Sequence, residues 1–119
     1  MNLVLIKTRL QREVLFRYPG AEAIFGGVLL GVKSPSGLAF YDWDTMSLVR
    51  RIEIQPKSVF WSENGELVAI TTDDGYFVLT FDPNAFANAT GDDISEDGVE
   101  SAFDVRGFFY MNETYIDKK

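Results

Sequence analysis

Three observations predict an all-β fold for this sequence. The chain of 119 residues contains ten Phe, five Tyr and two Trp, and 46% of its residues are hydrophobic. Aromatic and β-branched residues favour strands, and this hydrophobic fraction is enough for a packed core. Short apolar segments separated by turn residues follow one another between positions 25 and 82. Two of these segments also repeat at a fixed spacing.

The expected strands are set by alternating apolar residues and by the turn residues between them. Pro and Gly predict a turn at 34–37, Asn64-Gly65 predicts a hairpin, and Asp73-Asp74-Gly75 predicts another turn. The strands expected from these patterns are residues 26–32, 38–44, 47–54, 59–61, 67–72 and 76–82. In 47–54, Ile52 and Ile54 share one face while Arg51 and Glu53 share the other.

The repeat appears when position 28 is laid over position 66. VLLGVKSPSGLAFYDWD (28–44) then lies over ELVAITTDDGYFVLTFD (66–82), with Gly37 over Gly75 and apolar positions in phase on both sides. A period of this size, near 40 and built from short strands, is typical of propeller blades. Trp43-Asp44 falls where the third strand of a WD-type blade ends. The fold predicted is therefore a partial WD40-type β-propeller of about two four-stranded antiparallel blades.

The organisation expected from this pattern has three parts. Residues 1–18 form a divergent N-terminal segment with a strand, 19–83 form the blades, and 84–119 form an acidic, partly helical loop and a divergent tail. The basic N-terminal segment only loosely resembles a transit peptide. Because two blades leave strand edges and apolar faces uncovered, we expect a section of a larger assembly with poor independent stability.

Composition and charge exclude several function classes. The chain has no Cys and no His, which excludes disulfides, Cys/His zinc sites and triads built on those residues. Its net charge of −7 argues against binding to nucleic acid phosphates. No apolar run approaches the length that crosses a bilayer. The sequence predicts no enzyme, no cofactor and no catalytic or metal-ligating residue.

Several segments resemble a known family. The runs GAEAIFGGVLLGVKSPSGLAFYDWD, RRIEIQPK, VFWSENGELVAITTDDGYFVL and EDGVESAFDV are similar to the coatomer beta-prime family of the COPI vesicle coat. The resemblance covers about residues 20–105 and falls in the second WD propeller of that family. Residues 1–18 match loosely, and RGFFYMNETYIDKK (106–119) departs from the family.

The resemblance implies a scaffold function in Golgi-to-ER vesicle transport through protein–protein contacts. It implies a cytoplasmic protein, peripheral on Golgi membranes and COPI vesicles, whose partners are other coatomer subunits, the alpha subunit in particular. It carries over no cargo-binding residue. The alternative functions are a generic WD-repeat interaction domain and a calcium-binding acidic loop.

The calcium alternative rests on DISEDGVESAFD, residues 93–104. Asp93, Ser95, Asp97 and Asp104 fall at positions one, three, five and twelve of a calcium loop, and Gly98 falls at position six. Ser at position three, Asp at position twelve and a poor preceding helix oppose it. The competing interpretation is an acidic loop that leads into a short helical turn.

Other candidate features are expected to be structural. The basic pair Arg50-Arg51 is expected to face solvent, paired with Glu53 or Asp42. The alternative is a contact with an acidic partner or a phosphoinositide. No Lys or Arg occurs between Ser58 and Val105. Trp43 and Trp61 are expected to pack between blades rather than to bind ligands. The paired carboxylates (Asp42 with Asp44, Asp73 with Asp74) are assigned to a strand end and a turn rather than to catalysis.

Overall fold

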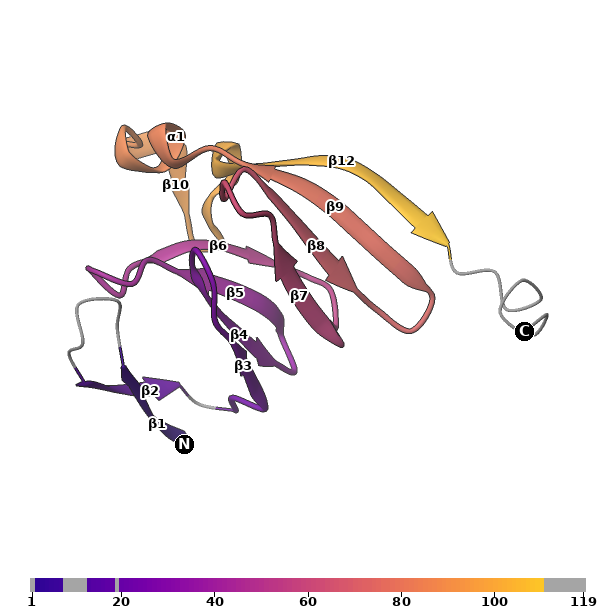
Figure 1. The fold of residues 1–119 in the computed structure, drawn as a ribbon. Coiled ribbons are helices and arrows are strands. Elements are labelled where there is room, and N and C mark those ends of the chain that lie inside the picture. Colours follow the sequence, from indigo (N-terminus) through magenta and orange to yellow (C-terminus); the bar gives the residue numbers. More distant parts are fainter. Residues whose placement is uncertain (1, 8–12, 19, 111–119) are drawn as a thin grey trace.

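The computed structural model describes residues 2–7, 13–18 and 20–110 of the chain. Within them, two antiparallel sheets pack against each other, and a separate N-terminal hairpin precedes them (Figure 1). The hairpin pairs β1 (Asn2–Lys7) with β2 (Glu13–Tyr18). The fold class predicted from the sequence, a nearly all-β partial propeller, is confirmed.

The first sheet contains blade 1, a four-stranded meander. Its strands are β3 (Ala23–Phe25), β4 (Leu30–Ser34), β5 (Gly37–Tyr41) and β6 (Leu48–Ile52). Each strand pairs antiparallel with the next. The expected single strand over 26–32 is wrong, because the chain bends at residues 26–29 between β3 and β4.

The second sheet is blade 2. It consists of β7 (Ser58–Trp61), β8 (Leu67–Thr71), β9 (Gly75–Phe81) and β12 (Phe103–Tyr110), in the order β12-β9-β8-β7. The hairpin at Asn64-Gly65 and the turn at 73–75 are confirmed. The fourth strand of this blade comes from within the segment expected to be an acidic loop and tail.

The segment between β9 and β12 leaves blade 2 and returns to blade 1 (Figure 1). It contains the elements α1 (Pro83–Ala87), η1 (Gly91–Asp93), β10 (Ile94–Ser95), β11 (Gly98–Val99) and η2 (Glu100–Ala102). Strands β10 and β11 form a hairpin that extends the first sheet beyond β6. We call residues 94–99 the clasp. The helical turn expected near EDGVESAF is confirmed as η2.

The main core lies between the two blades. Both blades contribute to it, and its centre is aromatic: Phe40 of β5 stacks on Phe103 with ring centroids 5.1 Å apart, and Trp61 meets Phe40 edge-on at 5.7 Å. The buried members of this core are Leu29, Leu38, Phe40, Val49, Val68, Ile70, Leu79, Phe81, Val99, Ala102 and Phe103. Because the buried area is shared between the sheets, neither blade has this core by itself.

Candidate interaction surface

The repeat found in the sequence is also present in three dimensions. In blade 1, Leu30 pairs with Tyr41. In blade 2, Val68 pairs with Leu79, and these two residues are the repeat equivalents of Leu30 and Tyr41. The pairing of the third strand with the fourth also shifts register at the same place in both blades. In blade 1 the shift lies between Phe40 and Tyr41, and in blade 2 it lies between their equivalents Val78 and Leu79, which pair with Gly107 and Val105. The two blades are therefore copies in register, which permits position-by-position comparison.

Both blades have a glycine at the same position of the repeat because the backbone of the fourth strand passes close to it. Gly37 opens β5, and a Cβ there would lie 2.5 Å from the carbonyl oxygen of Ile52 on β6. Gly75 opens β9, and a Cβ there would overlap the carbonyl oxygen of Phe109 on β12. In each blade the fourth strand occupies the space of a side chain, so the third strand must begin with glycine.

Comparison of the blades identifies an exposed apolar face. On blade 1, Leu29 and Leu38 are buried against blade 2, whereas their equivalents Leu67 and Tyr76 on blade 2 are exposed. Phe60 of β7 is also exposed, by 60%. We call this surface the outer face; its residues are Phe60, Leu67, Ala69, Tyr76, Val78 and Phe109.

The clasp fastens blade 2 to blade 1 through backbone and side-chain contacts. The amide of Arg51 donates to the carbonyl oxygen of Asp97 at 2.8 Å, and Gly98 pairs with Arg50. Gly98 has a φ of +95°, and a Cβ on it would overlap the carbonyl oxygen of Val49. Glycine is therefore required here both by its backbone conformation and by the closeness of β6.

The basic pair Arg50-Arg51 contacts this insertion. The Arg51 guanidinium forms an ion pair with Asp97 at 2.5 Å and also donates to the carbonyl oxygen of Ser36 at 2.8 Å. The Arg50 guanidinium donates to the carbonyl oxygens of Glu100 and Phe103 at 3.2 and 3.0 Å. The ion pair expected with Glu53 or Asp42 is instead formed with Asp97, because the returning segment lies across the edge of β6.

The geometry does not support the calcium-binding alternative for residues 93–104. The Asp93 carboxylate accepts the amide of Thr90, the Ser95 hydroxyl accepts the amide of Asp97, and the Asp97 carboxylate is paired with Arg51. In the described part of the chain, no three acidic side chains gather into a group that could hold a metal ion. Residues 94–99 of this loop form the clasp on the edge of β6.

The two tryptophans pack against opposite faces of blade 1. Trp61 packs into the core between the blades, as expected, and lies directly over Gly27. Trp43 instead packs on Leu30 and Val32, on the face away from blade 2, and its indole N–H donates to the carbonyl oxygen of Gly27 at 2.8 Å. The Trp43-Asp44 pair lies just beyond the end of β5, in the turn that leads to β6.

The acidic pair around Trp43 is structural, as expected. The Asp42 carboxylate accepts the amides of Asp44 and Thr45 at 3.2 and 2.9 Å, which turns the chain after β5. In the second acidic pair, the amide of Asp74 donates to the hydroxyl of Thr72, and the Asp73 carboxylate forms an exposed ion pair with Lys57. Both acidic pairs therefore lie in turns, and their hydrogen bonds stabilise the local backbone.

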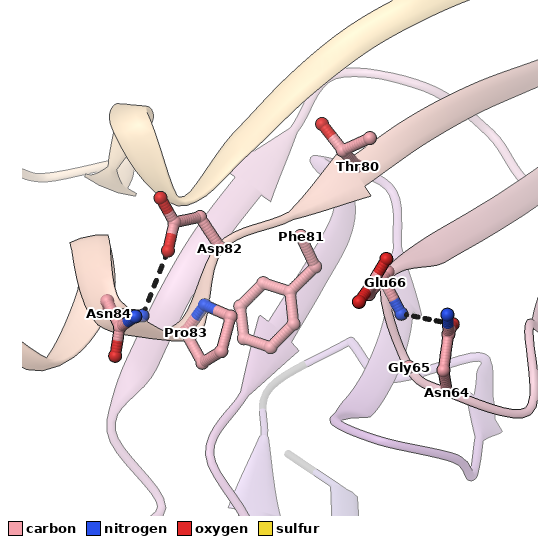
Figure 2. Close-up of a pocket in the computed structure, with 8 residues that line it drawn as sticks. All are labelled: Asn64, Gly65, Glu66, Thr80, Phe81, Asp82, Pro83 and Asn84. Atoms are coloured by element: carbon pink, nitrogen blue, oxygen red, sulfur yellow. Dashed lines mark hydrogen bonds between the residues drawn. The ribbon is translucent and has the colours of Figure 1, made fainter.

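One shallow pocket lies where the β7–β8 loop meets the start of α1 (Figure 2). Its volume is about 460 Å³. The Asp82 carboxylate caps α1 by accepting the amides of Asn84 and Ala85, and the Asn64 side-chain carbonyl accepts the amide of Glu66. These polar groups are engaged in holding the local backbone rather than directed at a common point in the pocket.

Comparison with known proteins agrees with this architecture. A family model described as the COPA/B second beta-propeller matches residues 2–109. The chain belongs to the COPA/B second beta-propeller family. The match begins at β1, so this family includes the N-terminal hairpin that the sequence resemblance covered only loosely.

Relatives of this COPA/B propeller chain include coatomer subunits from several animals. The chain is 61% identical over 90 residues to "Coatomer subunit beta'" of Drosophila melanogaster, and 54% identical over 90 residues to the human protein of that name. Each alignment covers 74% of this chain, and the chain spans about a tenth of the length of these relatives. Among the residues that the structure describes, no helix is long and apolar enough to cross a membrane.

Proposed function

We propose that this chain is a scaffold section of the COPI coat and acts in Golgi-to-ER vesicle transport through protein–protein contacts alone. Its family membership and its identity to coatomer subunit beta' proteins support this function. On this proposal the chain is cytoplasmic and peripheral on Golgi membranes. Its partners are other coatomer subunits, with the alpha subunit first among them, and it carries out no catalysis.

The observation that carries the proposal is the match in sequence and in architecture over the same residues. The family model spans both blades and the N-terminal hairpin, and the blades keep one register. A scaffold segment needs rigid blades with exposed faces that fit neighbours, and the outer face provides one such surface. Apolar side chains such as Phe60 gain free energy when a neighbouring surface covers them.

The proposal is tested by transplantation into a full-length relative. The matched segment of a coatomer subunit beta' is replaced by that of this chain, and association with the remaining coatomer subunits is measured by co-precipitation. We expect the chimera to assemble like the parent protein. A chimera that folds, as judged by circular dichroism, but does not associate with coatomer would contradict the proposed function.

Two variants control for the surface involved. Phe60→Asp places a charge on the outer face, and we expect it to reduce assembly of the chimera. Ile94→Asp changes a residue of similar exposure on the clasp, away from the outer face, and we expect normal assembly. Equal loss in both variants would mean that a general fall in stability, and not the outer face, explains the defect.

A further inference from the structure

The outer edges of the two blades differ in one respect. In blade 1, the edge of the fourth strand β6 is occupied by the clasp, which adds β11 and β10 to the sheet. In blade 2, the equivalent fourth strand β12 pairs with β9 on one side, and no strand of the described chain pairs with its other side. Blade 1 therefore shows how a strand edge can be paired that is open in the described part of blade 2.

The repeat identifies which residues of β12 correspond to the docking site on β6. Leu48 pairs with Tyr41, and Val105 pairs with Leu79, the repeat equivalent of Tyr41. Across the register shift that follows in both strands, Arg50 corresponds to Gly107 and Arg51 corresponds to Phe108. The bulged residue that precedes them is Val49 in β6 and Arg106 in β12.

The hydrogen-bonding direction is the same at both edges. The amide of Arg51 points away from β5 and donates to Asp97 of the clasp. Backbone amides alternate in direction along a strand, and Phe108 holds the position in β12 that Arg51 holds in β6. The amide of Phe108 therefore points toward the open edge, where an added strand would supply its acceptor.

We propose that residues 106–108 of β12 bind a short acidic β-hairpin, centred on glycine, from a protein partner. The glycine is required because a side chain on Gly98 would collide with the backbone of Val49 and Arg50, and the same backbone is present at 106–107. Acidic residues in the hairpin are favoured because Arg106 is exposed and has no ion pair among the described residues. This charge contact differs from that of the clasp, where Asp97 pairs with Arg51, the equivalent of Phe108. Strand addition of this kind is a known mode of peptide recognition.

The test uses the whole chain at low micromolar concentration and a synthetic peptide with the sequence of residues 93–102. Hydrogen exchange followed by mass spectrometry reports which amides the peptide protects. We expect slower exchange in β12 around Phe108 and no change in β6, whose edge is already filled. A matched peptide carrying Gly98→Ala is expected to bind at least about tenfold more weakly, because its side chain cannot fit against the strand.

A charge swap separates this site from non-specific binding. Arg106→Glu changes an exposed side chain, so the fold is retained, and we expect it to weaken binding about fivefold. The proposal would be overturned by unchanged exchange in β12, by protection confined to β6, or by equal binding of the glycine and alanine peptides. It would also be overturned if the chain formed a dimer without the peptide and Gly98→Ala abolished that dimer.

Discussion

Arg51 of β6 and Asp97 of the clasp lie 46 residues apart in sequence and form an ion pair across the edge of blade 1. The pair joins a strand of one blade to an insertion of the other. Because of the insertion, the fourth strand of blade 2 comes later in the sequence than the repeat predicts. A shift of 38 residues would put the equivalent of Ile52 at position 90, but Phe109 is the residue with the equivalent strand pairing. The additional residues are the ones that return to clasp β6.

Gly98→Ala is expected to release the clasp. The substitution forces a side chain into a left-handed conformation and against the carbonyl oxygen of Val49, so we expect a loss of at least about 2 kcal/mol in the free energy of unfolding. Gly91 also has a positive φ, of +46°, but a Cβ on it would meet no atom within 4 Å, so Gly91→Ala is the control and costs about 1 kcal/mol. Urea unfolding measures both; equal losses would mean that the clasp contact contributes nothing.

Gly75→Ala is expected to separate β12 from β9. A Cβ at Gly75 would overlap the carbonyl oxygen of Phe109, and neither backbone can move without breaking the ladder. We expect a loss of about 3 kcal/mol or more, seen as a lower thermal midpoint by circular dichroism. Gly26→Ala meets no atom within 4 Å and should leave the midpoint unchanged or slightly raised. A midpoint for Gly75→Ala near that of the control contradicts the close approach.

Phe40→Ala is expected to unfold most of the chain. Phe40 is fully buried between the blades and contacts both Trp61 and Phe103, so truncation leaves a cavity and costs about 3–5 kcal/mol. Phe60→Ala removes the same ring from an exposed position and is expected to change stability by less than about 0.5 kcal/mol. Chemical denaturation compares the two; similar costs would place the shared core elsewhere.

Arg51→Ala is expected to loosen the clasp without unfolding the blades. The ion pair with Asp97 is partly exposed, so its loss together with the bond to Ser36 costs about 1 kcal/mol, and less at high salt. Lys57→Ala removes a more exposed ion pair with Asp73 and is the control, with an effect near zero. Hydrogen exchange at the amides of the clasp should rise only in Arg51→Ala, and unchanged exchange there would argue against a role for the ion pair.

Local sequence patterns predicted most of the strands because each strand is encoded by neighbouring residues. The alternation in 67–72 and the turn residues at 73–75 predict β8 and the start of β9 directly. The register of the two blades was also predictable, since Gly37 and Gly75 mark the same point in each copy. The short strand β3 was missed because a strand of this length carries too little periodicity.

The clasp could not be predicted from local patterns. Its acidic residues resemble a cation loop in sequence, and nothing near them indicates that they pair with Arg51 far earlier in the chain. One signal was available in the sequence. The basic pair at 50–51 is complementary in charge to the later acidic stretch, which contains no Lys or Arg. The path that brings them together depends on tertiary packing of both blades.

We expect the chain to be an open section of a propeller, in which a neighbouring surface would cover the outer face of blade 2. Size-exclusion chromatography with light scattering, over a range of concentrations, measures whether the uncovered face drives association. We predict self-association or loss of solubility as the concentration rises, relieved by Phe60→Asp but not by Ile94→Asp, with a poorly cooperative thermal transition in the concentrated parent. A stable monomer of 13.4 kDa at every concentration, with a cooperative melt, would contradict the claim and show that two blades form a self-sufficient domain.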